Sequence, residues 1–482
     1  MATDNLRSTE LVTRRALKSI TMRVTQAALP GAAGLPGQAR FPSERLKLAV
    51  AYSGGLDSSV LLHLARVFAM DNGLDIIALH VHHGLSEQAD EWAMHCAKQA
   101  SKLGVSFDMR RIEVDAGGGN GVEGAARAGR YAALGDMCRV RRASLLLTAH
   151  HQDDQAETVL LQLLRGAGVA GLSGMDDVNP APDLLGNADL LMGRPMLALS
   201  RVALEEFAAA RGIVHVDDAS NSDPRFARNK LRHLVMPVLQ AQFPGFVQRF
   251  ARTARHARSA RQLLIELAQQ DFVICAVEDQ IDIVKLRALS VARCDNLLRY
   301  WFGSRGMRMP SSAWLQEMRG QLFGAKADAQ ILVSRDDCEI HRHRDRIVIT
   351  PRHAMRDPDQ EPVHFAWDGS QTMDFPGYGG NLKFTRAEQG VDASWLRMQT
   401  LTLQWRSGGW RLKLASNRPT RSLKYHYQAA QVPAWDRPRL PLVTVGTRLL
   451  YAAGIGMDCH YFGGRQDGGI VLEWEFAPSV LS

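Results

Sequence analysis

Residues 46–60 read LKLAVAYSGGLDSSV, an apolar strand that runs into a Ser-Gly-Gly turn and directly on into a helix. Glycines at positions 54 and 55 allow positive φ and let the backbone turn its N–H groups inward as an anion cradle. The positive end of the following helix points at the same place. No Lys follows the glycines, so this is not the GxxxxGK[ST] loop of the P-loop NTPases. The stretch predicts a phosphate-binding turn, against the alternative of a Gly-rich turn without a ligand.

The composition is that of an ordinary globular protein. At 482 residues the chain is long enough for two to four domains, and it contains 46% hydrophobic and 22% charged residues. No apolar run approaches the roughly 20 residues that span a bilayer. The formal net charge of +8 favours a polyanionic partner. The six cysteines are scattered without a CxxC pair, so the sequence suggests neither a zinc site nor an iron–sulfur site.

Strands and helices alternate from residue 46 to about residue 165. The pattern predicts strands at 46–52, 75–82, 105–114 and 144–149, with helices near 57–71, 86–103, 122–141 and 151–165. Such alternation indicates a parallel sheet covered on both faces, whose ligands gather beyond the carboxyl ends of the strands. The candidate functional groups each follow a strand, which supports this prediction: Ser53–Ser58, His80–Gly84, Asp115 and His150–Glu157.

Five segments are expected along the chain. Residues 1–43 are predicted to be a flexible N-terminal extension, although translation starting at Met22 is an alternative. Residues 44–235 form the α/β domain, in which 176–194 is expected to be a loop because it is rich in turn residues. Residues 236–350 are mainly helical to about 305 and form short strands at 326–350. A Pro- and Asp-rich linker at 351–363 leads to a β-rich α+β module at 364–482.

The second motif is TAHHQDDQAETVLLQLLRGAG, residues 148–168. If a helix begins near His150, then His150, Asp153 or Asp154, and Glu157 share one face. Carboxylates beside a phosphate loop suit Mg²⁺, for which Asp57 and Asp153 are the candidate ligands. They also suit binding an ammonium group and accepting its proton. The alternative is a helix start that is rich in acids because of the helix dipole.

Histidines and basic residues supply further candidates. On the strand that ends HVHH, His80 and His82 project to one face and His83 to the other, so contact with nucleotide or RNA is preferred over zinc, with a structural role as the alternative. Glu123 and Arg127 form an i,i+4 pair at the start of a helix. The pair has either a functional role or only a structural one. The basic segment 217–239 also contains the turn former Asn221.

A run of arginines follows in the helical region. Arg249, Arg252, Arg255, Arg258 and Arg261 recur at every third residue, which makes a winding basic stripe on a helix. Such a stripe suits a phosphate backbone and predicts salt-dependent binding. The alternative is a solvated helix face.

In combination these motifs resemble a known family. The Ser53–Ser58 loop resembles the SGGxDS loop of the ATP pyrophosphatases. SGGLDSS, HVHHGL, the segment from Glu123 to Arg130-Tyr131, HHQDDQAET and SNSDPRFARNKLR occur in the order seen in tRNA(Ile)-lysidine synthetases. The stretch NRPTRSLKYHYQAAQVPAWDRPRLPLV also looks like that family's C-terminal substrate domain. The resemblance implies a doubly wound parallel sheet of the adenine nucleotide alpha hydrolase type, then a helical domain and a small C-terminal α+β domain.

The resemblance also implies an activity. Members of that family use ATP to adenylate the carbon-2 oxygen of the wobble cytidine in a CAU-anticodon isoleucine tRNA, and the ε-amino group of free L-lysine then displaces AMP. It implies ATP and Mg²⁺ as cofactors and a cytoplasmic enzyme that is often a homodimer. The rival interpretations are a tRNA thiolase with the same loop, which generally needs cysteines at the site, and a catalytically inactive tRNA-binding protein.

The candidate site residues fall into three groups. The ATP-binding candidates are Ser53, Gly54, Gly55, Leu56, Asp57 and Ser58. The catalytic candidates are Asp57, His150, Asp153, Asp154 and Glu157. The candidates for contact with tRNA or substrate are His83, Glu123, Arg127, Arg130, Arg165, Asn221, Arg225, Arg228, Asn229, Arg232, Arg252, Arg255 and Arg258.

Overall fold

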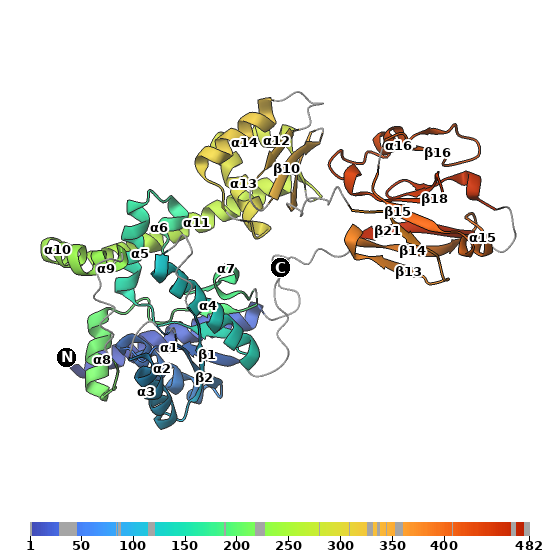
Figure 1. Ribbon diagram of the computed structural model, residues 1–482. Helices are drawn as coiled ribbons and strands as arrows, with labels where there is room; N and C mark the ends of the chain where they lie inside the picture. The colour runs from blue at the N-terminus through green and yellow to red at the C-terminus, as the bar shows by residue number, and fades with distance from the viewer. Residues whose placement is uncertain are drawn as a thin grey trace. The chain divides into compact units, whose positions relative to one another are not determined.

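The computed structural model (Figure 1) describes most of the chain and divides it into two compact units. The described residues are 2–27, 46–82, 84, 88–113, 121–187, 189–216, 227–278, 280–307, 309–324, 331–334, 338–343, 345–351, 360–406, 408–463 and 469–476. Unit 1 comprises Met1–Ile274 and Ser290–Gly306, and unit 2 comprises Cys275–Leu289 and Met307–Ser482. Within the described residues, no helix is long and apolar enough to cross a membrane.

Unit 1 is built on a six-stranded sheet with the order β3-β2-β1-β4-β6-β5. Its strands are β1 (Lys47–Ala51), β2 (Asp75–His82), β3 (Ser106–Arg111), β4 (Leu145–Leu147), β5 (Val178–Pro180) and β6 (Leu191–Gly193). All neighbouring pairs are parallel except β5 with β6. The predicted parallel sheet and its first four strands are therefore confirmed.

Helices cover both faces of this sheet, as in a doubly wound fold. Those that contribute to its two cores are α2 (Leu56–Asp71), α3 (Ala89–Lys102), α4 (Gly121–Arg141), α7 (Pro182–Leu185) and α8 (Arg201–Arg211). Two further helices, α5 (Gln152–Leu164) and α6 (Val169–Leu172), lie between β4 and β5 in the chain. Alternate residues of β1 face opposite sides of the sheet. Leu48 and Val50 join a core that contains α2 and α8 side chains, whereas Ala49 joins a core with Leu134 of α4. A strand buried on both sides must be apolar throughout, which explains the run at 48–51.

The N-terminal helix α1 (Ala2–Ala27) belongs to the first of these cores. Its Leu17, Ile20 and Val24 are buried, at the i, i+3, i+7 spacing of one helix face. The expected flexible extension is therefore wrong for residues 2–27, and core residues lie on both sides of Met22. Residues 28–43 lie outside the described part of the chain. The sequence prediction gave weight to the Pro/Gly-rich stretch and overlooked this apolar face.

Because α1 contributes to the core, truncating its buried face should destabilise unit 1. Leu17→Ala should lower the free energy of unfolding by about 3 kcal/mol, since a fully buried leucine leaves a cavity. Leu11→Ala on the same helix is the matched control, because Leu11 is 48% exposed and Leu17 is 0% exposed. Hydrogen exchange of unit 1 peptides across a urea series measures both values. Equal losses for the two variants would contradict the packing of α1.

The segment 176–194, predicted to be a loop, is largely ordered. It contains β5, α7 and β6, and β6 extends the parallel sheet beside β4. The turn residues Pro180, Pro182 and Gly186 dominate the sequence pattern, and the three-residue strands between them are too short to show a period. The structure of this segment therefore depends on its pairing with the sheet, which the local sequence does not encode.

The remaining elements of unit 1 are helical. They are α9 (Ala227–Lys230), a π-helical turn η2 (Leu231–Val235), α10 (Met236–Gln242), α11 (Phe246–Cys275) and α13 (Val291–Ser304). The predicted helical region from 236 to 305 is confirmed apart from a short hairpin, β7 (Ala276–Val277) with β8 (Gln280–Asp282). This hairpin belongs to the first sheet of unit 2.

Unit 2 begins with a five-stranded antiparallel sheet of order β7-β8-β11-β10-β9. Its other strands are β9 (Ile331–Ser334), β10 (Cys338–His343) and β11 (Arg346–Pro351), which confirms the predicted strands at 326–350. The helices of this part are α12 (Ile283–Ala288) and α14 (Ser312–Gly324). Most of the predicted linker, residues 352–359, lies outside the description.

The C-terminal part is an α+β module, as predicted. Its strands are β12 (Val363–Phe365), β13 (Thr372–Phe375), β14 (Gly380–Ala387), β15 (Leu401–Gln404), β16 (Arg411–Leu412), β17 (Arg421–Ser422), β18 (Leu442–Val445), β19 (Arg448–Ala452), β20 (Gly456–Met457) and β21 (Gly469–Phe476). Its helices are α15 (Ala393–Arg397), α16 (Leu423–Ala429) and the 3₁₀ turns η3 (Pro376–Tyr378), η4 (Arg437–Arg439) and η5 (Cys459–Tyr461). One core containing Trp367, Leu382, Leu403 and Tyr427 joins its sheets. The exact limits of the five predicted segments remain a prediction.

Candidate active site

The turn between β1 and α2 is held open by its own backbone and serines. Gly54 has φ +88°, and its carbonyl accepts a hydrogen bond from the Val216 N–H at 3.0 Å. The Ser53 and Ser58 hydroxyls lie 3.1 Å apart, and Ser58 Oγ donates to the Gly55 carbonyl at 3.0 Å. No described side chain caps α2 at Gly55. The first N–H groups of α2 therefore have no side-chain cap among the described residues, which is the arrangement that an anion-binding site requires.

The conformation at Gly54 leads to a specific prediction. A Cβ there would lie 2.8 Å from Cys96 Sγ and would have to adopt positive φ, so Gly54→Ala should distort the turn. Gly73→Ala is the matched control, because Gly73 also has positive φ but a Cβ would meet nothing within 4 Å. We expect Gly73→Ala to cost about 1 kcal/mol from strain alone, and Gly54→Ala to cost more and to weaken ATP binding. Thermal denaturation and ATP titration check this; equal behaviour of both variants would contradict it.

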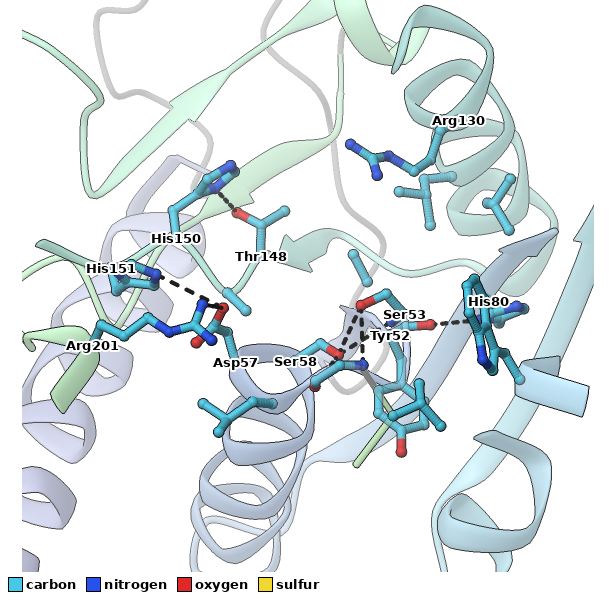
Figure 2. Close-up of a pocket in the computed structure, with 18 of the residues that line it drawn as sticks. Tyr52, Ser53, Asp57, Ser58, His80, Arg130, Thr148, His150, His151 and Arg201 are labelled. Carbon is cyan, nitrogen blue, oxygen red and sulfur yellow. Dashed lines mark hydrogen bonds and ion pairs between the residues drawn. The ribbon is translucent and has the colours of Figure 1, made fainter. Parts of the chain in front are cut away.

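A cavity of about 990 Å³ opens beside this turn in unit 1. The ends of β1, β2 and β4 meet at it, together with residues of α4, α5, α8 and η2. Its polar lining includes Ser53, Asp57, Ser58, His80, Arg130, Thr148, His150, His151, Asp153, Glu157, Arg201 and Arg232. Figure 2 shows Asp57 and Ser58 at the start of α2, with Arg130 and Arg201 entering from different helices. The cavity thus lies at the edge of the sheet where the sequence predicted the functional groups to gather.

Asp57 has one oxygen that is paired and one that is not. Its Oδ2 lies 3.3 Å from Arg201 Nη1 and 3.8 Å from His151 Nε2. Its Oδ1 is buried and has no hydrogen-bond partner among the described residues. Burial raises the pKa of Asp57, although the charges of His151 and Arg201 oppose that shift. An unpartnered buried carboxylate oxygen beside a phosphate loop is the kind of group that a cation satisfies.

His151 connects Asp57 to the start of α5. Its Nδ1 accepts from the Asp153 N–H at 3.3 Å, and Asp154 Oδ2 accepts from the His151 N–H at 3.0 Å, which forms a reciprocal helix cap. The ring is 2% exposed. Burial lowers the pKa of His151, but the hydrogen bond to Asp153 and the charges of Asp154 and Asp57 outweigh burial and raise it. Sequence reasoning named His150 and missed His151, for which the second position of the His pair was the available signal.

Two arginines form ion pairs with Asp154 and Glu157. Arg228 Nε lies 2.7 Å from Glu157 Oε2 and its Nη2 2.9 Å from Asp154 Oδ1. Arg232 Nε lies 2.6 Å from Glu157 Oε1, and its Nη2 lies 3.2 Å from Asp154 Oδ1. Burial of Asp154 is outweighed by the charges of His151 and Arg228, which lower its pKa to about 2. These two arginines therefore neutralise carboxylates of this chain, and their predicted contact with tRNA or substrate stays a prediction.

His150 lies before α5, which begins at Gln152, and not on the helix face that the sequence predicted. The cap formed by His151 sets this start. His150 Nδ1 and Thr148 Oγ1 share a hydrogen bond of 2.9 Å. Desolvation lowers the pKa of His150 to about 3, so the ring is neutral at physiological pH.

The described residues that could hold a metal are few. No group of three or more His, Cys, Asp or Glu side chains among the described residues is arranged for a metal ion. Mg²⁺ bound to a nucleotide needs only one or two protein carboxylates, because phosphates and water complete its shell. Asp57, with its unpartnered Oδ1, fits that requirement, and Asp153 shares His151 and Arg201 with it as neighbours.

Of the other candidate residues, some line the cavity, some lie outside it and some fall outside the described residues. Arg130 lines the cavity, and its guanidinium lies 5.5 Å from the ring centroid of Tyr131, with Arg127 at 5.0 Å. His80 Nδ1 lies 2.9 Å from the Tyr52 carbonyl oxygen. Arg165 is exposed at the C-terminal end of α5, outside the cavity lining, and Asn229 is half-buried in α9. The candidates outside the described residues are Asp115, His83, Asn221, Arg225 and the side chain of Glu123.

The basic stripe of α11 is only partly free. Arg258 pairs with Asp176 and Asp177 at 2.8 and 3.0 Å, and Arg261 pairs with Asp176 at 2.9 Å. Acids from the segment before β5 therefore neutralise these two arginines, and the predicted contact of Arg258 with tRNA stays a prediction. Arg252 and Arg255 are exposed.

Arg201 is the residue that sequence reasoning missed altogether. It begins α8 after the N-cap Ser200, and its backbone N–H donates to Asp153 Oδ2 at 2.9 Å. Together with its contact to Asp57, this bond ties the phosphate loop to the HHQDD segment. No local pattern around Arg201 marks it as functional.

Comparisons with known proteins show the family of the chain. The family model of the PP-loop domain matches residues 34–239, the TilS substrate binding domain matches 281–348 and the TilS substrate C-terminal domain matches 401–474. The tRNA(Ile)-lysidine synthase of Ralstonia nicotianae is 40% identical over 85% of this chain and 89% of its own length. That of Burkholderia pseudomallei is 39% identical over 90% and 94%, and that of Nitrosomonas europaea is 36% identical over 90% and 93%. The chain belongs to the tRNA(Ile)-lysidine synthase family.

Proposed function

We propose that the chain uses ATP to attach free L-lysine to carbon 2 of the wobble cytidine in a CAU-anticodon isoleucine tRNA, in the cytoplasm. The observation that carries the proposal is the meeting of three motifs at one cavity: the Ser53–Ser58 turn, the His150–Glu157 segment and Arg232. The turn suits ATP phosphates, and Asp153 in the second motif supplies a carboxylate for a cationic amino acid, while Arg232 neutralises the neighbouring Glu157. The family relationship supports the same reaction.

The first step is adenylation of the cytidine. The carbon-2 oxygen attacks the α-phosphorus of ATP, the bond to the β-phosphate oxygen breaks, and pyrophosphate leaves. The N–H groups at the start of α2 would stabilise charge on the departing pyrophosphate. Mg²⁺, held by Asp57 with Asp153, would supply further charge neutralisation on the phosphates. The turn thus contributes to the reaction by positioning the phosphates and stabilising their charge.

The second step is attack of the lysine ε-amine on carbon 2, with AMP as the leaving group. Lysine must lose a proton first, because its reference pKa is about 10.4. Asp154, with a pKa of about 2, is a poor proton acceptor, and it is absent from the cavity lining. Asp153 and Glu157 do line the cavity, but Glu157 is paired with Arg228 and Arg232. We therefore assign the binding of the ammonium group and the acceptance of its proton to Asp153, after pyrophosphate and its Mg²⁺ have left.

The thiolase alternative requires a reactive cysteine. Cys96 lies behind Gly54, nearer to the turn than its sequence position suggested. It is fully buried, and burial raises its pKa to about 12, so it is a thiol at neutral pH. It is also absent from the cavity lining. The cysteine beside the turn therefore gives no support to sulfur transfer.

The test combines purified protein, α-labelled ATP, labelled lysine and transcript tRNA. Incorporation of one lysine into CAU-anticodon tRNA, with release of AMP and pyrophosphate, is the expected result. A CAU-to-GAU anticodon transcript is the control. ATP turnover without lysine incorporation would favour a thiolase, and tRNA binding without turnover an inactive binder; either result contradicts the proposal.

The exposed arginines of α11 provide a separate test of RNA binding. Arg252→Ala with Arg255→Ala should weaken tRNA affinity and reduce the slope of log affinity against log salt by about 1 to 2, if each contacts one phosphate. Filter binding across a salt series measures the slope. Arg139→Ala, an exposed arginine paired with Asp136 on α4, is the control. An unaltered slope in the double variant would remove α11 from the RNA interface.

A further inference from the structure

We propose that Arg201 binds the β- and γ-phosphates of ATP and the pyrophosphate that leaves, as a second phosphate-binding element opposite the Ser53–Ser58 turn. The inference rests on the proposed function, because it assigns a residue to its first step. Arg201 and the turn line the same cavity and meet through Asp57.

The backbone fixes the position from which Arg201 reaches the cavity. Ser200 Oγ accepts from the Ala203 N–H at 3.3 Å, and the Arg201 N–H donates to Asp153 Oδ2 at 2.9 Å. The side chain is steered by Glu205, one helical turn on, whose Oε1 accepts from Arg201 Nε at 3.1 Å. Because its backbone N–H and its Nε are both hydrogen-bonded, the Arg201 side chain should lose little conformational entropy when it binds a phosphate.

The guanidinium still has donors to offer. Nη1 makes one contact, 3.3 Å to Asp57 Oδ2, which is long for a charge-assisted hydrogen bond. Within the described residues, Nη2 has no hydrogen-bond partner, and the side chain is 40% exposed. Arg201 therefore lines the cavity with two nitrogens that could donate to a phosphate: Nη1, which makes one long contact, and Nη2, which makes none within the described residues.

Arg232, which also lines the cavity, is already paired with carboxylates of this chain. Arg232 directs Nε and Nη2 to Glu157 and Nη2 also to Asp154, with three bonds of 3.2 Å or less. A triphosphate placed at the start of α2 would lie beside the Asp57 carboxylate, which repels it. Arg201 is the cation in contact with that carboxylate, so it offsets the repulsion where the phosphates arrive.

The test measures which part of the nucleotide depends on Arg201. Arg201→Met keeps the length of the stem and removes the charge, and isothermal titration with pyrophosphate and with AMP reports each part separately. We expect pyrophosphate and ATP to bind about tenfold more weakly or worse, and AMP to bind within about twofold of wild type. Arg211→Met is the matched control, because Arg211 ends the same helix in an exposed pair with Glu10.

A double-mutant cycle separates direct contact from an effect through Asp57. In EDTA and in an Asp57→Asn background, Arg201→Met should still weaken pyrophosphate binding about tenfold. Loss of the effect in that background, unchanged pyrophosphate affinity in the single variant, or an equal loss for AMP would each overturn the proposal. All of these outcomes leave lysine ligation by the wild-type protein untouched. Failure of the proposed function would instead appear as no lysine incorporation by the wild type.

Discussion

Asp57→Asn should slow adenylation of tRNA by a factor on the order of 10² to 10³ while leaving tRNA affinity nearly unchanged. The amide keeps the shape of the side chain but removes the charge at Oδ1, which is buried and has no hydrogen-bond partner in the part of the chain that the structure describes. A cation on the nucleotide phosphates would lose its protein ligand at that point. Single-turnover transfer of labelled AMP to tRNA measures the rate, and filter binding measures the affinity.

The same variant should be at least as stable as the wild type. Burial raises the pKa of Asp57, so the folded state disfavours its charged form at neutral pH. Removing that charge therefore removes a cost, even though the contacts to His151 and Arg201 weaken. A rise or no change in the melting temperature, together with the loss of adenylation, is the expected combination. A large loss of tRNA affinity or of stability would show that Asp57 acts structurally.

Arg228→Met should lower the free energy of unfolding of unit 1 by about 3 to 5 kcal/mol. It leaves Asp154 and Glu157, both buried, with Arg232 as the remaining arginine between them. Hydrogen exchange of unit 1 peptides in a urea series measures the loss. Arg139→Met is the control, because its pair with Asp136 is exposed and should cost no more than about 1 kcal/mol.

The deficit of Arg228→Met should also depend on pH. In the wild type, Asp154 has a pKa of about 2, below its unfolded value of about 3.9, partly because of the charge of Arg228. The stability from this depressed pKa is present above about pH 4 and is lost as the pH falls towards 2. The gap between variant and wild type should therefore narrow across that range. A gap that is constant from pH 7 to acid would mean that Arg228 contributes by packing alone.

Local pattern was enough to predict the scaffold of the site. The apolar run before Ser53, the two glycines and the acid-rich start of α5 each carry their structural meaning within a few residues. Parallel strand order then brings Asp57 and Asp153 to one edge, and both contact His151 and Arg201 there. For these residues, sequence spacing and the sheet-edge rule were sufficient.

Long-range pairing was the part that the sequence could not reveal. The partners of Asp154 and Glu157 lie more than 70 residues away, and Arg258 finds its acids 81 and 82 positions earlier in the chain. A count of local charges treats such arginines as free for RNA. The same limitation applies to β6, whose place beside β4 depends on pairing, and to α1, whose apolar face has meaning only against the core.

The proposed function requires that the turn after β1 bind the phosphates of ATP, so that AMP passes to the RNA. A crystal structure of the protein with α,β-methylene ATP and Mg²⁺ tests it most directly, because this analogue resists cleavage between the α- and β-phosphates. We expect the β- and γ-phosphates on the backbone N–H groups of residues 54–58, with the α-phosphate open to the cavity. A nucleotide bound elsewhere, with this turn empty, would rule out phosphate binding by the turn and with it the proposed reaction.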